Sequence, residues 1–472
     1  MTTIKFGTDG WRALMDKEFT FENVSLVAQA FSDYIKNEFL KEGLQRFPKV
    51  VIGFDYRKDS ENFARTIAEI LIANDIKVHL SNTACPTQAV SFTIVDEKQD
   101  AGIAVTASHN PAGYNGFKIK MGFGGSADKV FTNGVESYIG RHSVLKKAFS
   151  PKNPRITDLT ENYLKFLKKY VNLNAIRKAP YRVLVDSMHG VGARNIETIL
   201  AGGKIKITTI RSERDVTFGG VSPEPIPHNL GVTIERMKKN DFDLAVVTDG
   251  DADRVGAVRP GGEFISPGIL LSLILIHFVE DLKKTGSVVT TVSNTALIYK
   301  VARKYGLKVH ETPVGFKYIC EIMRRENVLI GGEESGGIGF QNYLYERDGM
   351  LSGLLLMEMM AMRKKSFDEI LKEVENEFGK LSYIRDDLTY PNESKVKFFE
   401  FLSSYTPKEL MGQKVKEVKK ADGVKLILED DSWLLFRLSG TEPILRVYSE
   451  AASKRLAEDL VKHGKDLAFQ RV

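Results

Sequence analysis

Apolar residues along this chain gather in short continuous runs, and longer stretches with helical spacing separate the runs. The runs at 50–55 and 101–106 predict buried strands, because side chains that are apolar at successive positions can face both sides of a covered sheet. The apolar positions between 24 and 35 and the segment 64–73 predict helices. Short buried strands that alternate with helices are typical of parallel α/β domains.

The same alternation of predicted strands and helices is found in two further units, which begin near Pro154 and near Gly256. Helical sequence over 350–378 then leads to a C-terminal unit that reads as a small antiparallel sheet closed by a last helix. The strands predicted in these three units are, in order, 182–185, 205–210 and 244–248; 288–292, 308–310 and 328–330; and 425–428, 433–438 and 444–449.

Each of the three α/β units carries a polar loop with glycine or proline just after an apolar strand. These loops are TASHNP at 106–111, TDGDADR at 248–254 and GGEESGG at 331–337. In open parallel sheets, ligands bind at the ends of the strands. We therefore expect the three loops to meet in one cleft between domains.

Composition excludes several classes of protein. The chain has 472 residues, of which 43% are hydrophobic, enough for several packed cores. Its two cysteines, Cys85 and Cys320, form no C-x-x-C motif, which argues against a disulfide framework or structural zinc and favours a reducing cytoplasm. The net charge is +6 without a polybasic run, so we expect no nucleic acid but an anionic small substrate.

Nothing in the sequence predicts a membrane association. The first ten residues lack the basic start and apolar block of a signal peptide. The longest apolar stretch, 268–279, is interrupted by Ser272 and His277 and is too short to cross a bilayer, so it predicts a buried helix.

Asp249, Asp251 and Asp253 place three carboxylates in a five-residue loop. Such crowding is costly unless a cation neutralises it, and oxygen-only ligands favour Mg²⁺ before Ca²⁺. An EF-hand is excluded, because its sixth and twelfth positions would be Arg254 and Pro260 instead of glycine and glutamate. The alternative is a solvated acidic turn, which the buried strand just before the loop disfavours.

Ser108 offers a hydroxyl on a tight loop and needs activation to take part in phosphoryl transfer. His109 is not assigned as its base from sequence, because neighbouring side chains usually diverge. Arg12, Lys118 and Arg254 are candidate cations for a phosphate site; a lysine with a lowered pKa can also act as a base. Taken singly, a serine in such a loop is more often an ordinary turn residue, and a lysine or arginine is more often a surface charge.

The segment RLSGT at 437–441 combines a guanidinium, two hydroxyls and a glycine turn, and such a segment can bind an anion. The alternative is an ordinary turn between two strands, which has the same sequence pattern. The sequence GFGGS at 122–126 lacks the last glycine of a dinucleotide fingerprint, and no Walker motif is present. Phosphate chemistry without a nucleotide site favours a mutase or a phosphatase over a kinase.

Six motifs in this order resemble the α-D-phosphohexomutase superfamily, which includes phosphoglucomutase and phosphomannomutase. They are FGTDGWR (6–12), TASHNP (106–111), YNGFK (114–118), TDGDADR (248–254), GEESG (332–336) and RLSGT (437–441). The resemblance implies three related α/β domains with mixed or parallel sheets and a smaller C-terminal α+β domain around a central cleft. We place these domains at 1–150, 151–257, 258–378 and 379–472.

The resemblance also implies roles for individual residues. Ser108 would carry the phosphoryl group, and its phosphate would complete the Mg²⁺ shell of the three aspartates. His109 and Lys118 would serve as acid and base, with Arg12 and Arg254 beside the phosphoserine. The residues implied in substrate binding are Thr312, Gly315, Lys317, Glu333 and Ser335 for the sugar, and Arg437, Ser439, Gly440 and Thr441 for the phosphate that does not react.

The expected activity is the interconversion of hexose 1-phosphate and hexose 6-phosphate through a 1,6-bisphosphate, which would also act as activator. The Glu333-Glu-Ser335 sequence resembles glucose-type enzymes, so glucose is preferred and mannose accepted; phosphoglucosamine mutases typically carry Glu-Gln-Ser. We expect a cytoplasmic monomer or homodimer. The alternatives are an aspartyl phosphatase, since Asp251-Ala-Asp253-Arg-Val255 fits D-x-D-x-V, and a phosphosugar-binding protein without activity.

Overall fold

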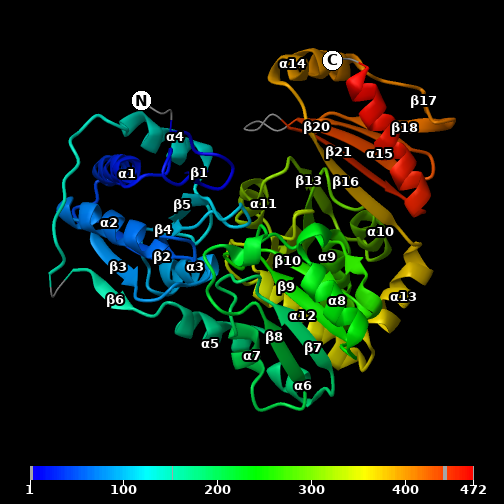
Figure 1. Ribbon diagram of the computed structural model, residues 1–472, viewed down its shortest axis with the longest axis horizontal. Helices are drawn as coiled ribbons and strands as arrows, with labels where there is room; N and C mark the ends of the chain where they lie inside the picture. Colours follow the sequence, from blue (N-terminus) through cyan, green and yellow to red (C-terminus); the bar gives the residue numbers. More distant parts are fainter. Residues whose placement is uncertain (1–3, 151–152, 439–443, 471–472) are drawn as a thin grey trace.

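The computed structural model describes residues 4–150, 153–438 and 444–470 and shows four sheets, each with its own helices (Figure 1). Three units combine α-helices with mixed sheets, and the C-terminal unit has a purely antiparallel sheet. The predicted fold class, three α/β domains and a smaller α+β domain, is confirmed. Residues Ser439, Gly440 and Thr441, which we expected at a phosphate site, lie outside the described residues.

The first sheet has the order β1-β5-β4-β2-β3-β6, parallel from β4 to β6 and antiparallel at β5 and β1. Its strands are β1 (Trp11–Leu14), β2 (Lys49–Phe54), β3 (Lys77–Ser81), β4 (Ala101–Val105), β5 (Tyr114–Met121) and β6 (Arg155–Thr157). Its helices are α1 (Phe21–Lys41), α2 (Ser60–Ala73), α3 (Thr87–Asp96) and α4 (Lys129–Tyr138). The apolar runs predicted as strands are β2 and β4, both buried.

The second sheet has the order β11-β10-β9-β7-β8. Its strands are β7 (Arg182–Asp186), β8 (Lys206–Ile210), β9 (Leu244–Thr248), β10 (Val255–Val258) and β11 (Phe264–Ile265). The helices of this unit are α5 (Thr160–Tyr170), α6 (Leu173–Lys178), α7 (Asn195–Leu200) and α8 (Gly231–Lys239).

The third sheet has the order β13-β12-β14-β15. Its strands are β12 (Ser287–Thr291), β13 (Val309–Thr312), β14 (Val328–Gly332) and β15 (Ile338–Phe340). Its helices are α9 (Pro267–Ile276), α10 (Leu297–Lys304), α11 (Phe316–Met323), α12 (Gly349–Arg363) and α13 (Phe367–Phe378). Helix α9 is buried, as predicted. No stretch of helix within the described ranges combines the length and the hydrophobicity needed to cross a bilayer.

The C-terminal sheet has the order β16-β21-β20-β19-β18-β17. Its strands are β16 (Ser382–Thr389), β17 (Glu409–Leu410), β18 (Gln413–Lys419), β19 (Val424–Leu428), β20 (Trp433–Leu438) and β21 (Ile444–Ala451), and its helices are α14 (Asn392–Ser404) and α15 (Lys454–Phe469). In Figure 1 this unit lies beside the third domain, on the side where β13 and α10 are found.

The sheets do not end where the domain boundaries were expected. Strand β6 pairs with β3 of the first sheet, although it follows the boundary expected at 150/151. The boundary expected at 257/258 falls within β10, and β11 extends the second sheet to Ile265. Strands β6 and β11 have only three and two residues, so the sequence offered no apolar run long enough to mark either.

The second and third domains share one continuous core. Helix α12 follows the third sheet in the chain but packs on the second: a Cβ at Gly353 would lie 2.6 Å from Val246 Cγ1 on β9. Residues of β9, α9, β12 and α12 belong to a single buried apolar cluster. The loops after β9 and β14 are therefore held on one rigid body.

Polar contacts fix the C-terminal domain on the third domain. The Glu450 carboxylate accepts hydrogen bonds from the backbone N–H of Ala296, at 2.7 Å, and from Trp433 Nε1, at 3.1 Å. The Lys425 ammonium donates to the Val292 carbonyl oxygen at 2.8 Å and lies 3.9 Å from the centre of the Trp433 ring.

Candidate active site

The Ser108 loop follows the buried strand β4, which ends at Val105. Ser108 has a φ of 52°, in the left-handed region that non-glycine residues seldom adopt. Its backbone N–H donates to Thr106 Oγ1 at 2.9 Å. Its buried hydroxyl donates to Asp249 Oδ2 at 2.8 Å, so the first and second domains meet at this serine.

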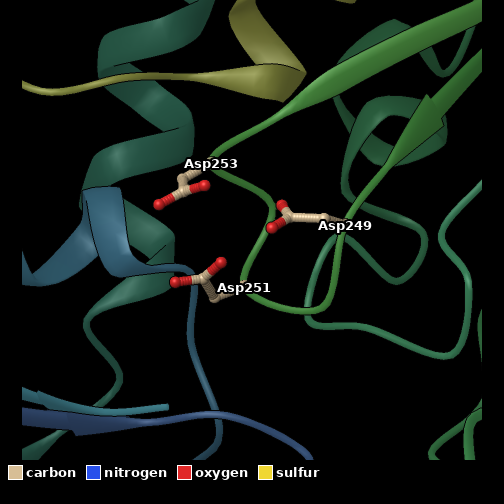
Figure 2. A group of neighbouring side chains, drawn as sticks. All are labelled: Asp249, Asp251 and Asp253. Carbon is tan, nitrogen blue, oxygen red and sulfur yellow. The ribbon is translucent and has the colours of Figure 1, made fainter. Parts of the chain in front are cut away.

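The three aspartates lie on the loop between β9 and β10, where alternate positions face the same side. Their carboxylates converge on a common space (Figure 2), and one oxygen of each lies within 4.8 Å of the others. All three residues are fully buried. Burial, together with the negative charges of Asp253 and Asp251, raises the pKa of Asp249 well above its usual value.

Two oxygens of this loop, Asp251 Oδ1 and Asp253 Oδ1, are buried and accept no hydrogen bond, although Arg254 Nε lies 4.0 Å from Asp253 Oδ1. Unsatisfied buried carboxylate oxygens are costly unless a cation binds them. The donor set consists of oxygens alone, which suits a hard divalent cation such as Mg²⁺. The residues present therefore fit the metal site that the sequence predicted.

Lys118 extends from β5 into the same space and is fully buried. Its Nζ lies 2.7 Å from Asp251 Oδ2, 2.9 Å from Asp9 Oδ2 and 3.2 Å from Asp253 Oδ2. Burial lowers the pKa of Lys118, but these three carboxylates outweigh burial and raise the pKa above its usual value. A lysine that acts as a base needs a lowered pKa, and the three carboxylates around Lys118 have the opposite effect.

His109 lies closer to the serine than the sequence suggested. Its Nδ1 is 3.3 Å from Ser108 Oγ, although side chains of neighbouring residues usually diverge; the left-handed φ of Ser108 turns the two side chains toward each other. Burial and the positive charges of Arg254 and Arg12 lower the pKa of His109 well below its usual value. The imidazole is therefore neutral at pH 7, and the same burial and positive charges oppose its protonation.

Arg12 and Arg254 lie beside two loops: the one that carries Ser108, called the serine loop below, and the one that carries Asp249, Asp251 and Asp253, called the acidic loop. Arg12 Nη1 donates to Asn110 Oδ1 at 2.9 Å, two residues beyond the serine. The backbone N–H of Arg254 donates to Asp249 Oδ1 at 3.0 Å, and its guanidinium lies 3.6 Å from Glu224. Both guanidinium groups therefore lie beside the loops that carry Ser108 and Asp249.

The turn that carries Glu333 lies against the acidic loop. The Val255 N–H donates to the Gly336 carbonyl at 3.0 Å, which joins the turn to the strand just after Asp253. Glu333 is buried, and its Oε2 lies 3.2 Å from Arg347 Nη1, whereas Ser335 is half-buried.

The loop that carries Thr312, Gly315 and Lys317 lies against the first domain. A Cβ at Gly315 would be 2.9 Å from Thr8 Cγ2, in the N-terminal motif. Thr312 is buried at the end of β13 and Lys317 is half-buried. The structure thus brings this loop to the first domain, near the FGTDGWR motif.

Arg437, at the end of β20, connects the C-terminal domain to the same loop. Its Nε donates to Asp422 Oδ2 at 2.8 Å, and that oxygen also accepts the N–H of Val314 at 2.9 Å. The guanidinium is therefore placed within reach of the loop at 312–317.

Sequence reasoning missed Arg347, a buried residue that joins three loops of the site. Its Nη2 lies 2.7 Å from Asp9 Oδ2 and 2.6 Å from Asp253 Oδ2, and its Nη1 contacts Glu333. The only signal in the sequence was the charged triplet Glu-Arg-Asp at 346–348, directly before a strongly apolar helix. Thr87 was missed as well: its hydroxyl donates to Asp251 Oδ2 at 2.7 Å.

Comparison with known proteins agrees with this arrangement over almost the whole chain. Four family models match in chain order: phosphoglucomutase/phosphomannomutase α/β/α domains I (residues 3–144), II (161–262) and III (268–378) and the C-terminal domain (405–463). The chain is 30% identical to a phosphoglucomutase/phosphomannomutase of Thermococcus kodakarensis over 472 residues, 97% of each chain. It is also 30% identical to a phosphoglucosamine/phosphogalactosamine mutase of Sulfurisphaera tokodaii, over 98% of each chain.

Solved structures show the same four-domain fold. A phosphomannomutase-class protein of Thermus thermophilus is 35% identical, covers 99% of both chains and superposes with a TM-score of 0.87. The N-acetylphosphoglucosamine mutase of Aspergillus fumigatus, solved with GlcNAc-6P and magnesium, shares the fold at 13% identity and a TM-score of 0.59, over 100% of this chain and 96% of its own. The chain belongs to the phosphoglucomutase/phosphomannomutase family of α-D-phosphohexomutases.

Proposed function

We propose that this protein is a magnesium-dependent phosphohexomutase that interconverts hexose 1-phosphate and hexose 6-phosphate through phosphorylated Ser108. The observation that carries the proposal is the contact of 2.8 Å between Ser108 Oγ and Asp249 Oδ2, next to two unpartnered carboxylate oxygens. A hydroxyl at this position can hold a phosphoryl group against a cation bound by Asp249, Asp251 and Asp253. Mg²⁺ there would stabilise negative charge on the transferring phosphoryl group.

In the first transfer, a sugar hydroxyl oxygen forms a bond to the phosphorus while the bond from phosphorus to Ser108 Oγ breaks. The hydroxyl proton passes to a base of the enzyme, Ser108 Oγ takes up a proton from an acid of the enzyme as it leaves, and the product is a hexose 1,6-bisphosphate. The reverse transfer from the other phosphate restores phosphoserine, so a hexose 1,6-bisphosphate also acts as activator. Arg12 and Arg254 would bind the phosphoryl oxygens, since guanidinium groups suit phosphate geometry.

Two groups are candidates for the base. His109 is neutral and lies near the serine, so it needs no prior deprotonation to act as a base, although the burial and positive charges that keep it neutral also make it a weak one. Lys118 takes this role only if the negative charge around it falls, because Asp251 and Asp253 now stabilise its ammonium form. A divalent cation held by the same two carboxylates would reduce that stabilisation and lower the pKa of Lys118.

We assign sugar recognition to the third domain and recognition of the second phosphate to the C-terminal domain. Glu333 and Ser335 would bind hydroxyl groups, and the loop with Thr312, Gly315 and Lys317 would contact the sugar. Arg437 with the segment 439–441 would bind the phosphate that does not react. Turning the bisphosphate around requires the C-terminal domain to move, and each such movement must break the Glu450 and Lys425 contacts.

Glucose phosphate is the proposed preferred substrate, with mannose phosphate accepted, because the sugar loop reads Glu-Glu-Ser. An amino sugar is the second candidate, since one relative at 30% identity is a phosphoglucosamine/phosphogalactosamine mutase. We further propose that the protein acts in the cytoplasm as a monomer or homodimer.

A coupled assay with Mg²⁺ and glucose 1,6-bisphosphate tests the proposal on the 1-phosphates of glucose, mannose and glucosamine. We expect conversion to the 6-phosphate, loss of turnover in Ser108→Ala and phosphate on Ser108 in the intact protein. An aspartyl phosphatase would instead release inorganic phosphate, lose activity in Asp251→Asn and retain it in Ser108→Ala. A protein that only binds phosphosugars would bind them without turning them over.

A further inference from the structure

Arg57 is a fully buried arginine that holds the backbone of the serine loop. It follows β2, the strand next to β4 in the sheet. Its Nη1 donates to the carbonyl oxygens of Pro111 and Tyr114, at 2.8 and 3.0 Å. Its Nη2 donates to those of Ser108 and Asn110, at 2.7 and 2.6 Å. One guanidinium thus satisfies four carbonyls of a single loop.

The guanidinium is itself fixed on its other sides. Its Nε lies 3.2 Å from Asp55 Oδ2, and the other oxygen of Asp55 accepts the N–H of Arg57 at 3.0 Å and the Ser60 hydroxyl at 2.7 Å. The ring of Phe218, from the second domain, lies 4.8 Å from the guanidinium carbon. Among the described contacts of Arg57, no hydrogen bond or ion pair is made to Asp249, Asp251 or Asp253. Its direct contacts with the site are those to the loop, and its charge also acts at longer range on Asp251, Asp249 and His109.

The serine loop needs such support because of its backbone. The left-handed φ of Ser108 is unfavourable for a residue with a side chain and persists only where the surroundings impose it. Hydrogen bonds from a charged donor are stronger than those from a neutral one. The bond to the Ser108 carbonyl acts on the strained residue itself.

We propose that Arg57 is a positioning residue that holds residues 108–114 so that the Ser108 hydroxyl faces the acidic loop. This inference rests on the proposed phosphoryl transfer through Ser108. Lysine cannot replace Arg57 in this role, because its donors share a single nitrogen, whereas the four carbonyls are divided between two guanidinium nitrogens.

The test compares Arg57→Lys and Arg57→Ala with Arg65→Ala, a control that removes an exposed arginine of α2. Circular dichroism and thermal unfolding first establish which variants are folded. We expect kcat of Arg57→Lys to fall about 100-fold, because small displacements of a reacting group have such effects. KM for the sugar phosphate and Kd for Mn²⁺ should stay within about threefold, and guanidinium at about 10 mM should restore kcat of Arg57→Ala about tenfold.

Three results would overturn the positioning role: kcat of Arg57→Lys within twofold of wild type, a rise in KM with unchanged kcat, or loss of Mn²⁺ binding in parallel with kcat. Should Arg57→Ala not fold, Arg57→Lys decides, because an unchanged kcat in that variant is enough to overturn the role. An inactive wild type with an inactive Arg65→Ala overturns the proposed function and the role of Arg57 with it. An active wild type with an unchanged Arg57→Lys overturns the role of Arg57 alone.

Discussion

A Cβ atom at Gly250 would lie 2.4 Å from the carbonyl oxygen of Ser108. That separation is shorter than a van der Waals contact, so only glycine lets the acidic loop approach the serine loop this closely. On the other side, a Cβ at Gly190 would lie 2.7 Å from the Gly250 carbonyl oxygen. The acidic loop is therefore confined between two neighbouring loops, and its close approach to Ser108 depends on the absence of side chains.

Gly250→Ala should separate Ser108 from the aspartates. We expect about 1–3 kcal/mol loss of stability, as for other overpacked sites, and a kcat about 100-fold lower because the serine and the metal site move apart. Gly231→Ala is the matched control, because nothing lies within 4 Å of a Cβ at that position. Thermal unfolding and the mutase assay measure both effects; equal kcat in the two variants would contradict the close approach.

Arg347 should be essential to the stability of the site. Arg347→Met leaves Lys118 as the remaining shared partner of the buried carboxylates of Asp9 and Asp253, and removing one member of a buried ion pair typically costs about 3–5 kcal/mol. The control Arg325→Met removes an exposed arginine paired with Glu321, and we expect it to cost less than about 1 kcal/mol. The free energies of unfolding of the wild type and the two variants are measured with denaturant, in the presence and in the absence of Mg²⁺. Similar losses in both variants would show that Arg347 does not join the loops.

Strands are predicted best from the sequence where they are buried, because a buried strand is a continuous run of apolar residues. Strands β4 and β9 are continuous apolar runs, and both lead directly into the Ser108 and Asp249 loops. Strand β5 was not predicted, because it carries the buried polar residues Asn115, Lys118 and Lys120. Sequence alone does not distinguish a buried charge from a surface charge, and its partners come from distant segments.

The same limitation explains why Arg57 and Arg347 were missed. Arg57 is held by carbonyls more than fifty residues away, and Arg347 by Asp9, 338 residues away. Family motifs supply candidate residues for the reaction, but they do not indicate how the loops that carry these residues are fixed. The pairing of β6 with β3 of the first sheet likewise depends on a contact that no local sequence pattern predicts.

The metal site predicts a stability that depends on divalent cations. Mg²⁺ should raise the unfolding temperature of the wild type, because a cation at 100 times its Kd adds about 2.7 kcal/mol to the free energy of unfolding. Asp251→Asn should lose most of this shift, while Asp241→Asn, at a fully exposed position, should keep it. The measurement is thermal unfolding with MgCl₂ against NaCl of equal ionic strength; an equal shift in both variants would place the cation elsewhere.

The free energy of unfolding should depend on pH through Lys425, which lies at the contact between the C-terminal domain and the third domain. Burial lowers the pKa of Lys425 to about 8, so the folded protein binds fewer protons than the unfolded chain between about pH 8 and the usual lysine value. Stability therefore rises with pH across that window, by up to about 3 kcal/mol, and the cost of the buried charge is fully present below pH 8.

Lys425→Met removes this titration. Denaturant unfolding at pH 7.5 and pH 10 should show wild type gaining stability relative to Lys425→Met as pH rises. Lys416→Met, at an exposed lysine of β18, serves as control and should follow the wild type. A constant difference between wild type and Lys425→Met at both pH values would mean that Lys425 titrates normally in the folded protein.

The most direct measurement is the ³¹P hyperfine coupling, by electron–nuclear double resonance, in protein loaded with Mn²⁺ after reaction with glucose 1,6-bisphosphate. Phosphate attached to Ser108 and bound to the ion of the 249–253 loop predicts a strong coupling that is absent in Ser108→Ala. A phosphorylated Ser108 with no coupling to the bound Mn²⁺, or a protein that takes up no phosphate at Ser108, would contradict a shared site.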